Sequence, residues 1–404
     1  MVYPNLFPTA PITLVGKRHF QESFSQALSK QLLTAMSSRT NAVLESFSNF
    51  TVILNRVLAW VDFLVHYISG YLLFLFLGGL RPQYHTRAKR GYTPSVIITG
   101  ASQGIGLATT RHLASKGYNV FATVKDEVEL AKLAEDITDD AHKDLAPRIH
   151  FVIMNVLDQS SIDAALAAIS STVSKSPNSP LIALINNAGY CMISPMELTP
   201  PKALQDIFDL DFFAYVSTIR AFLPLLKQSS GRVINVVSYG AYINPPMWAP
   251  YAAIKAGLEA MTRAWRFELI PFGVGMTSIR PGWTRTAGIG PKISTAWRGY
   301  SDQIDKGAVG VNSLGEVVRS DYPVGHREKE VYSKIMHKWY NMTMAAAEGV
   351  AQPAEAVALT IHDALTDVFL QPYYTVGYDA LLGQMVRDLC PESLYELSMI
   401  KTFL

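Results

Sequence analysis

The pattern of hydrophobic and polar positions divides this 404-residue chain into distinct parts. Residues 57–80 are almost continuously apolar, and residues 81–94 are polar and basic. From Ser95 onward, short β-rich runs alternate with stretches of helical periodicity. Such alternation is typical of βαβ units, in which helices cover both faces of a parallel sheet. The sequence therefore predicts an α/β domain with a doubly wound parallel sheet over residues 95–404.

Six strands of this sheet can be placed from the sequence. They cover Ser95–Thr99, Asn119–Val124, Ile149–Asn155, Ile182–Asn186, Arg232–Val237 and Gly275–Ile279. Helical periodicity is clearest over Gly104–Lys116 and Ser160–Ser174. The pattern contains no internal repeat, so we expect one domain rather than an array.

The N-terminal part shows no sign of a folded domain. Residues 1–56 are rich in serine and hold only two acidic residues, Glu22 and Glu45. We expect a poorly ordered tail. The alternative is an organelle transit peptide, since such peptides are also serine-rich and poor in acidic residues.

Residues 57–80 are long enough to cross a membrane, which takes roughly 20 apolar residues in a helix. The alternatives are a helix lying in the membrane interface and a buried globular helix. A basic linker follows at residues 81–94, so the positive-inside rule places the following domain in the cytosol. We expect anchoring to the endoplasmic reticulum or another internal membrane.

Charge and cysteine content exclude several classes of function. The net charge of +2 provides no basic field for nucleic acid. Cys191 and Cys390 are too few for a disulfide framework, which fits a reducing compartment. Neither cysteine lies in a Cys/His cluster, so no metal site is expected.

The first strand ends in a glycine-rich turn that opens a helix. The turn reads Thr99-Gly100-Ala101-Ser102-Gln103-Gly104-Ile105-Gly106. Glycines there permit a tight turn, close approach of the backbone to a pyrophosphate, and close packing of helix on strand. The helix N-terminus also offers unpaired N–H groups to phosphates. The segment therefore predicts a dinucleotide-binding loop.

The end of the second strand indicates which dinucleotide is preferred. Enzymes that use NAD usually place a carboxylate there, on the ribose 2′-hydroxyl. In this chain Val124 occupies the slot and Lys125 follows, with Ser102 as a second donor, while Asp126 weakens the case. A cation without the carboxylate suits a 2′-phosphate, so we expect NADP(H) in preference to NAD(H).

The TGxxxGxG spacing of residues 99–106 resembles the short-chain dehydrogenase/reductase family, and further motifs of that family follow in order. They are NNAG at residues 186–189, a serine–tyrosine–lysine set, and PG at residues 281–282. The resemblance implies a Rossmann-type fold and is close over residues 95–286. It looks most like the branch that contains retinol, hydroxysteroid and acyl-dihydroxyacetone-phosphate dehydrogenases.

The resemblance also implies the cofactor contacts. Asn155-Val156 stands where the family usually has Asp-Val, so Asn155 is expected beside the adenine. Thr284 and Thr286 follow the PG turn and could reach the carboxamide or the pyrophosphate. The expected cofactor-binding residues are Gly100, Ser102, Gln103, Gly104, Ile105, Gly106, Lys125, Asn155, Val156, Asn187, Ala188, Gly189, Tyr251, Lys255, Pro281, Gly282, Thr284 and Thr286.

The reacting groups are predicted to be Ser238, Tyr251 and Lys255. Tyr251 and Lys255 lie four apart, on one helical face. A free tyrosine has a pKa near 10, and a nearby ammonium favours its phenolate. We expect Tyr251 to act as acid and base, and Ser238 to hold the substrate oxygen. Hydride would then move between the nicotinamide and a carbonyl or secondary alcohol.

One position departs from the family. A helical asparagine usually holds a water that leads to the lysine, and Asp211 occupies that slot here. A carboxylate accepts hydrogen bonds but donates none. It could still hold a water, and it would raise the pKa of Lys255 and weaken phenolate formation. We include Asp211 in the candidate catalytic set.

Residues 290–345 exceed what the family core requires. The segment contains the aromatic residues Trp297, Tyr300, Tyr322, Tyr332, Trp339 and Tyr340. It either caps a bulky apolar substrate or packs at the surface or an oligomer contact. The loop Tyr242–Pro250, with Met247 and Trp248, is a second expected pocket wall.

Three functions remain open at this point. The first is an enzyme acting on a lipid-like alcohol or ketone at a membrane, paired as the homodimer that the resemblance implies. The second is a catalytically weak dinucleotide-binding scaffold or sensor, supported by Asp211 and Asn155. The third is a soluble reductase imported into an organelle.

Overall fold

A computed structural model describes most of the chain from residue 92 onward. The described residues are 92–138, 142–286, 293–303, 306–312, 314, 316–321 and 323–403. Their central element is a seven-stranded parallel sheet with the order β12-β7-β6-β4-β1-β2-β3. The strands are β1 (Ser95–Ile98), β2 (Asn119–Val124), β3 (Ile149–Ile153), β4 (Leu181–Asn186), β6 (Arg232–Val236), β7 (Gly275–Pro281) and β12 (Tyr373–Val376). The predicted α/β fold with a doubly wound parallel sheet is confirmed.

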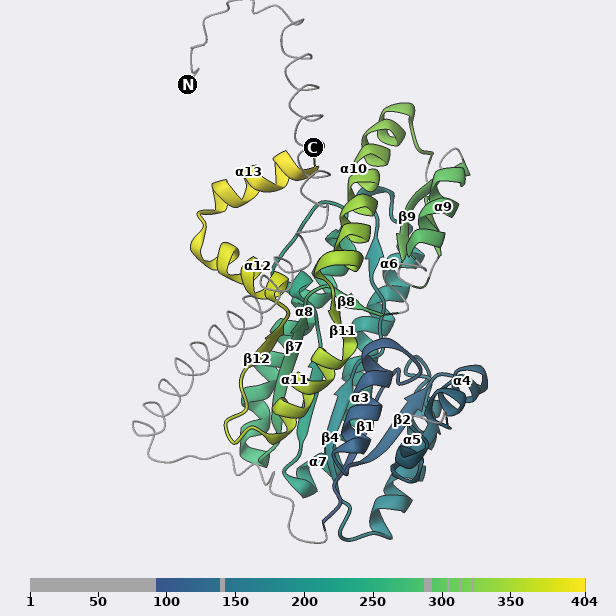
Figure 1. The fold of residues 1–404 in the computed structure, drawn as a ribbon, viewed down its shortest axis with the longest axis vertical. Helices are drawn as coiled ribbons and strands as arrows, with labels where there is room; N and C mark the ends of the chain where they lie inside the picture. The colour runs from purple at the N-terminus through teal and green to yellow at the C-terminus, as the bar shows by residue number, and fades with distance from the viewer. Residues whose placement is uncertain are drawn as a thin grey trace, which may run out of the picture. The chain divides into compact units, whose positions relative to one another are not determined.

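Helices cover both faces of the sheet, which explains why the central strands β1, β4, β6 and β7 are buried over almost their whole length. In β1, Val96 packs with the helices of one face and Ile97 with those of the other, and both are fully buried. The first face carries α3 (Gly104–Ser115), α4 (Glu127–Thr138) and α11 (Ala354–Thr366), and the second carries α5 (Gln159–Ser174), α7 (Ala214–Ser229) and α8 (Ala249–Leu269). In Figure 1, α3 and α11 lie side by side across the strands.

The extra segment folds mainly as two helices and a hairpin. It forms α9 (Ile293–Gln303), β9 (Ala308–Asn312), β10 (Val317–Arg319) and α10 (His326–Ala345), which Figure 1 shows grouped near α6 (Pro201–Phe208). Strand β9 pairs antiparallel with β10 and with β5 (Met192–Ile193), the short strand that follows β4. Trp339 of α10 is buried and donates from Nε1 to the Pro246 carbonyl at 2.8 Å. The segment is therefore joined to the main domain by hydrogen bonds and a shared core.

The chain ends in two helices, α12 (Tyr378–Leu389) and α13 (Glu392–Phe403). Phe403 stacks on Trp339 with 4.9 Å between ring centroids, which connects α13 to the extra segment. A further short parallel pair joins β8 (Thr284–Arg285) to β11 (Gln352–Pro353). The chain after the PG turn is thereby held against the residues that lead into α11.

The predicted membrane helix at residues 57–80 lies outside the described residues, as do the predicted tail and most of the basic linker. Within the described part of the chain, no helix combines the length and the apolar character needed to span a membrane.

Arg232, at the start of β6, joins the sheet to the C-terminal end of α11. Its guanidinium is buried and donates to the carbonyls of Ala364 and Asp367. Arg232→Met would leave buried acceptors without donors, so we expect it to lower the free energy of unfolding by about 1–3 kcal/mol. Chemical denaturation would measure this, with Arg220→Met, at an exposed position on α7, as control. Equal stability of both variants would contradict the proposed role of Arg232.

Candidate active site

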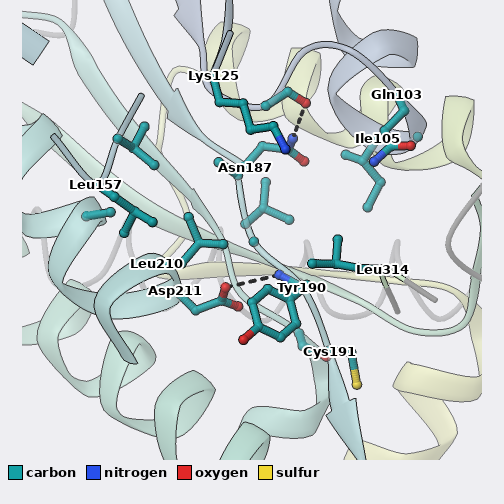
Figure 2. Close-up of a pocket in the computed structure, with 18 of the residues that line it drawn as sticks. Gln103, Ile105, Lys125, Leu157, Asn187, Tyr190, Cys191, Leu210, Asp211 and Leu314 are labelled. Atoms are coloured by element: carbon teal, nitrogen blue, oxygen red, sulfur yellow. Dashed lines mark hydrogen bonds between the residues drawn. The ribbon is translucent and has the colours of Figure 1, made fainter. Parts of the chain in front are cut away.

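A cavity of about 850 Å³ lies beyond the carboxyl ends of the central strands. The chain segments that follow β1, β2, β3, β4, β6 and β7 all contribute to its wall. In doubly wound sheets, ligands bind at this edge, where neighbouring strands lead the chain in opposite directions. All but one of the predicted site residues line this cavity, the exception being Gly106, which lies buried in the first turn of α3. Figure 2 shows Lys125 at one end of the cavity, and Asp211 and Tyr190 at the other.

The loop after β1 approaches its neighbours too closely for side chains. Gly100 has φ +65°, and a Cβ there would lie 2.9 Å from the Ala188 Cα. A Cβ on Gly106 would lie 2.1 Å from the Gly100 oxygen, and one on Gly104 would lie 3.1 Å from a Thr286 methyl. Helix α3 begins in this loop with no acidic residue in its first turn. The arrangement fits the pyrophosphate of a dinucleotide, because bare backbone N–H groups point at the ligand.

Asn187 holds this loop against the end of β4. Its side-chain amide donates to the carbonyls of Thr99 and Gly100, at 2.9 and 3.2 Å. In return the Thr99 hydroxyl accepts from the backbone N–H groups of Asn187 and Ala188, at 2.8 and 3.0 Å. The two loops are thus joined by protein hydrogen bonds, and their spacing does not depend on a ligand.

Lys125 lies at the opposite end from Asp211, and its side chain is 63% exposed. It pairs with Glu129 at 3.6 Å and with Asp126 at 3.9 Å. Glu129, in the first turn of α4, also lines the cavity, which the sequence analysis missed. Lys125 therefore brings a positive charge to the cavity wall, next to the carboxylates of Asp126 and Glu129.

Ser238, Tyr251 and Lys255 come together on the cavity wall. Tyr251 and Lys255 lie on one face of α8, and the Lys255 Nζ is 5.6 Å from the Tyr251 ring centroid. Burial raises the pKa of Tyr251 well above the ordinary value for tyrosine, while a hydrogen bond with Ser238 opposes that rise. The phenol is therefore protonated at neutral pH in this state of the protein.

Asp211 contacts Lys255 directly. It lies in a π-helical turn, Asp209–Phe213, and is fully buried. Its Oδ2 is 2.9 Å from the Lys255 Nζ, and its Oδ1 accepts the Tyr190 N–H at 3.0 Å. Burial raises the pKa of Asp211, and the neighbouring ammonium counters this. A direct ion pair thus occupies the place where the sequence analysis considered a bridging water.

Aromatic side chains support Tyr251 from behind. Trp248 is buried, meets the Tyr251 ring edge-on at 5.5 Å, and stacks on Trp339 at 5.1 Å. Neither Trp248 nor Met247 lines this cavity. Both side chains pack in a buried hydrophobic cluster, so they do not form the expected second pocket wall. The extra segment does reach the cavity, through Leu314. Other lining residues that the sequence analysis missed include Tyr190, Cys191, Leu210, Phe213 and Ser217.

The fold and this cavity define a dinucleotide-binding α/β protein. A comparison with protein families matches residues 94–295 to the family described as short chain dehydrogenase. The chain belongs to this family, which establishes it as a member of a group of oxidoreductases that use a nicotinamide dinucleotide.

Named relatives match about half of the chain. Mitochondrial D-beta-hydroxybutyrate dehydrogenase of Mus musculus is 30% identical over 206 residues, which cover 50% of this chain and 57% of the relative. Estradiol 17-beta-dehydrogenase 2 of Rattus norvegicus is 33% identical over 202 residues, 50% of each chain. The match thus spans about half the length of each relative.

A solved short-chain dehydrogenase from Streptomyces avermitilis has the same fold. It superposes with a TM-score of 0.55 at 22% identity, over 76% of this chain and 98% of that one. The likeness supports the architecture of the domain.

Gly189 provides a test of the packing around Asp211. A Cβ at Gly189 would lie 2.8 Å from the Asp211 Oδ1. We expect Gly189→Ala to lower the free energy of unfolding by about 1–3 kcal/mol, because a buried group must shift. The control is Gly257→Ala in α8, where the nearest atom would be 3.5 Å away and the helix gains up to about 1 kcal/mol. Thermal and chemical denaturation would show whether the two variants differ.

Proposed function

We propose that this protein is an NADP(H)-dependent oxidoreductase that interconverts a carbonyl and a secondary alcohol on a lipophilic substrate. The observation that carries the proposal is the meeting of Ser238, Tyr251 and Lys255 with the glycine-rich loop around one cavity. A proton donor and a dinucleotide cradle in one enclosure are the parts that carbonyl reduction by hydride requires.

The residues present fit a nicotinamide dinucleotide. The N-terminus of α3 would receive the pyrophosphate, Asn155 and Val156 would contact the adenine, and Lys255 would donate to the ribose hydroxyls. Ser102 and Lys125 line the same cavity and would donate to a 2′-phosphate, which supports the proposed preference for NADP(H). When bound, the dinucleotide supplies or accepts the hydride.

The protein's own groups handle the oxygen and its proton. In reduction, Ser238 donates a hydrogen bond to the carbonyl oxygen, and Tyr251 gives its proton to the oxygen as negative charge develops there. In oxidation the Tyr251 phenolate removes the alcohol proton. Because burial raises the pKa of Tyr251, the protonated form that reduction needs is abundant at neutral pH.

A lipophilic substrate is supported by the apolar side chains near Asp211. Figure 2 shows Leu210, Leu314 and the ring of Tyr190 at this end of the cavity. The apolar segment at residues 57–80 supports a location where such substrates concentrate, with the catalytic domain on the cytosolic side of an internal membrane. Pairing as a homodimer is part of the same proposal.

A catalytically weak dinucleotide-binding scaffold is the second candidate. Asp211 is the observation that favours it, since a buried carboxylate on Lys255 opposes formation of the Tyr251 phenolate. The two candidates differ in turnover but not in cofactor binding, so both properties must be measured.

Cofactor binding is the first test. Titration of the purified full-length chain, followed by fluorescence, should show tighter binding of NADPH than of NADH. Lys125→Ala should weaken NADPH binding by about ten- to a hundredfold, since a hydrogen bond between charged groups contributes about 1.5–3 kcal/mol. The control is Lys132→Ala, an exposed lysine on α4 outside the cavity. Binding of neither nucleotide would contradict the dehydrogenase proposal as well as the scaffold.

Turnover separates the two candidates. With NADPH and a panel of retinoid, steroid and long-chain ketones, we expect Tyr251→Phe to lower kcat by at least about 100-fold while cofactor binding persists, because only the proton donor is lost. Tyr242→Phe removes a half-buried hydroxyl outside the cavity, which donates to the Ala380 carbonyl, and serves as control. Absence of turnover by the unaltered protein on every substrate would favour the scaffold.

A further inference from the structure

The Asp211–Lys255 pair is held in place by its surroundings. The Lys255 side chain is 5% exposed and the Asp211 side chain is 0% exposed, so water screens the pair poorly. The Tyr190 N–H binds one carboxylate oxygen, and the backbone at Gly189 packs against the same group. Asp211 therefore cannot turn away from Lys255 without losing these contacts.

The pair changes the charge beside Tyr251. An asparagine at position 211 would be neutral, and Lys255 would then present a full positive charge to a phenol ring 5.6 Å away. With Asp211 the two side chains sum to zero charge. A cation next to a phenol stabilises the phenolate, so cancelling the cation stabilises the protonated phenol.

We propose that Asp211 is a positioning residue that cancels the charge of Lys255 and keeps Tyr251 a proton donor over a wider range of pH. The inference rests on the proposed function and refines it. The equilibrium between carbonyl and alcohol is unchanged. Carbonyl reduction extends to higher pH, and alcohol oxidation, which needs the phenolate first, begins at higher pH.

The proton and electron balance is that of a hydride transfer. In reduction a C–H bond of the reduced nicotinamide would break to supply the hydride, which forms the new C–H bond on the substrate. The C=O π bond breaks, and the Tyr251 proton forms the new O–H bond. Solvent returns a proton to the phenolate. In oxidation each step runs in reverse, with the oxidised nicotinamide as acceptor.

The other groups that face Asp211 are uncharged at neutral pH. They are Tyr251 from α8, Tyr190 and Cys191 from the segment after β4, and Tyr215 from α7. Burial raises the pKa of each, and that of Cys191 to about 12. The negative charges of Asp206 and Glu316 also raise the pKa of Tyr190. Of Lys255 and these groups around Asp211, Lys255 is therefore the one that carries a positive charge.

The same charge balance affects cofactor binding. The oxidised nicotinamide carries a positive charge, which an unpaired Lys255 would repel. The reduced nicotinamide is neutral and is indifferent to that charge. Neutralising Asp211 should therefore weaken the binding of NADP⁺ relative to NADPH, and this can be measured without turnover.

The experiment compares the full-length protein with Asp211→Asn, which keeps the size and the acceptor oxygen. Rates of reduction and oxidation are followed across neutral and alkaline pH, with a ketone and its alcohol that the unaltered protein turns over. For each direction, the pH midpoint is the pH at which the rate is half its maximum. We expect both pH midpoints to fall by about one unit in Asp211→Asn, because one nearby buried charge commonly shifts a pKa by about that much. The ratio of the NADP⁺ Kd to the NADPH Kd should rise several-fold.

Asp163→Asn is the control, because Asp163 is an exposed carboxylate of α5 that does not line the cavity. It should leave both the pH midpoints and the Kd ratio in place. Asp211→Ser, also neutral, repeats the test if Asp211→Asn does not fold.

The outcomes separate this inference from the proposed function. Unchanged midpoints with an unchanged Kd ratio would overturn the inference, as would a loss of rate that is equal at every pH, since that would give Asp211 a purely structural role. Failure of the unaltered protein to bind either nucleotide would remove the proposed function and this inference together.

Discussion

The close approach of the loops after β1 and β4 is the constraint on which the site depends. Asn187 joins them through the Thr99 and Gly100 carbonyls, and glycine at position 106 leaves room for the Gly100 oxygen. The strands themselves are adjacent and parallel, so both loops emerge at the same edge. In the sheet order β6-β4-β1-β2, the chain continues from β1 to β2 on one side and from β4 to β6 on the other. The cavity lies at this switch point between β1 and β4. Every other part of the site is arranged around this junction.

Most of the fold could be predicted because local patterns and tertiary packing agree. Strands such as Asn119–Val124 are apolar on both faces, which only a sheet covered by helices on each side satisfies. The glycine loop and the Tyr251–Lys255 spacing are likewise local features. Their placement around one cavity follows from the parallel topology, since residues at the carboxyl ends of adjacent strands must meet.

The parts of the site that sequence reasoning missed depend on long-range packing. Leu314 reaches the cavity because β9 pairs with β5, a pairing of two-residue and five-residue strands that no periodicity indicates. Trp248 was expected in a pocket wall but is stacked on Trp339, about ninety positions later in the chain. Asp211 was noted as a departure, yet its direct contact with Lys255 depends on a π-helical turn that the sequence does not reveal. Such turns occur often at functional sites.

The energetics of the Asp211–Lys255 pair favour a chemical reason for its presence. Burying two opposite charges carries a desolvation penalty that their attraction only partly repays, so such pairs are weak sources of stability. Here Asp211 receives one backbone hydrogen bond in addition to the ammonium, which leaves its burial costly enough to raise its pKa. A stability role would be served as well by apolar side chains of similar size. The pair lies on the cavity wall next to Tyr251, where a change of one charge alters the ionisation of the phenol directly. The physical effect of the pair is therefore greatest on the proton that the site has to transfer.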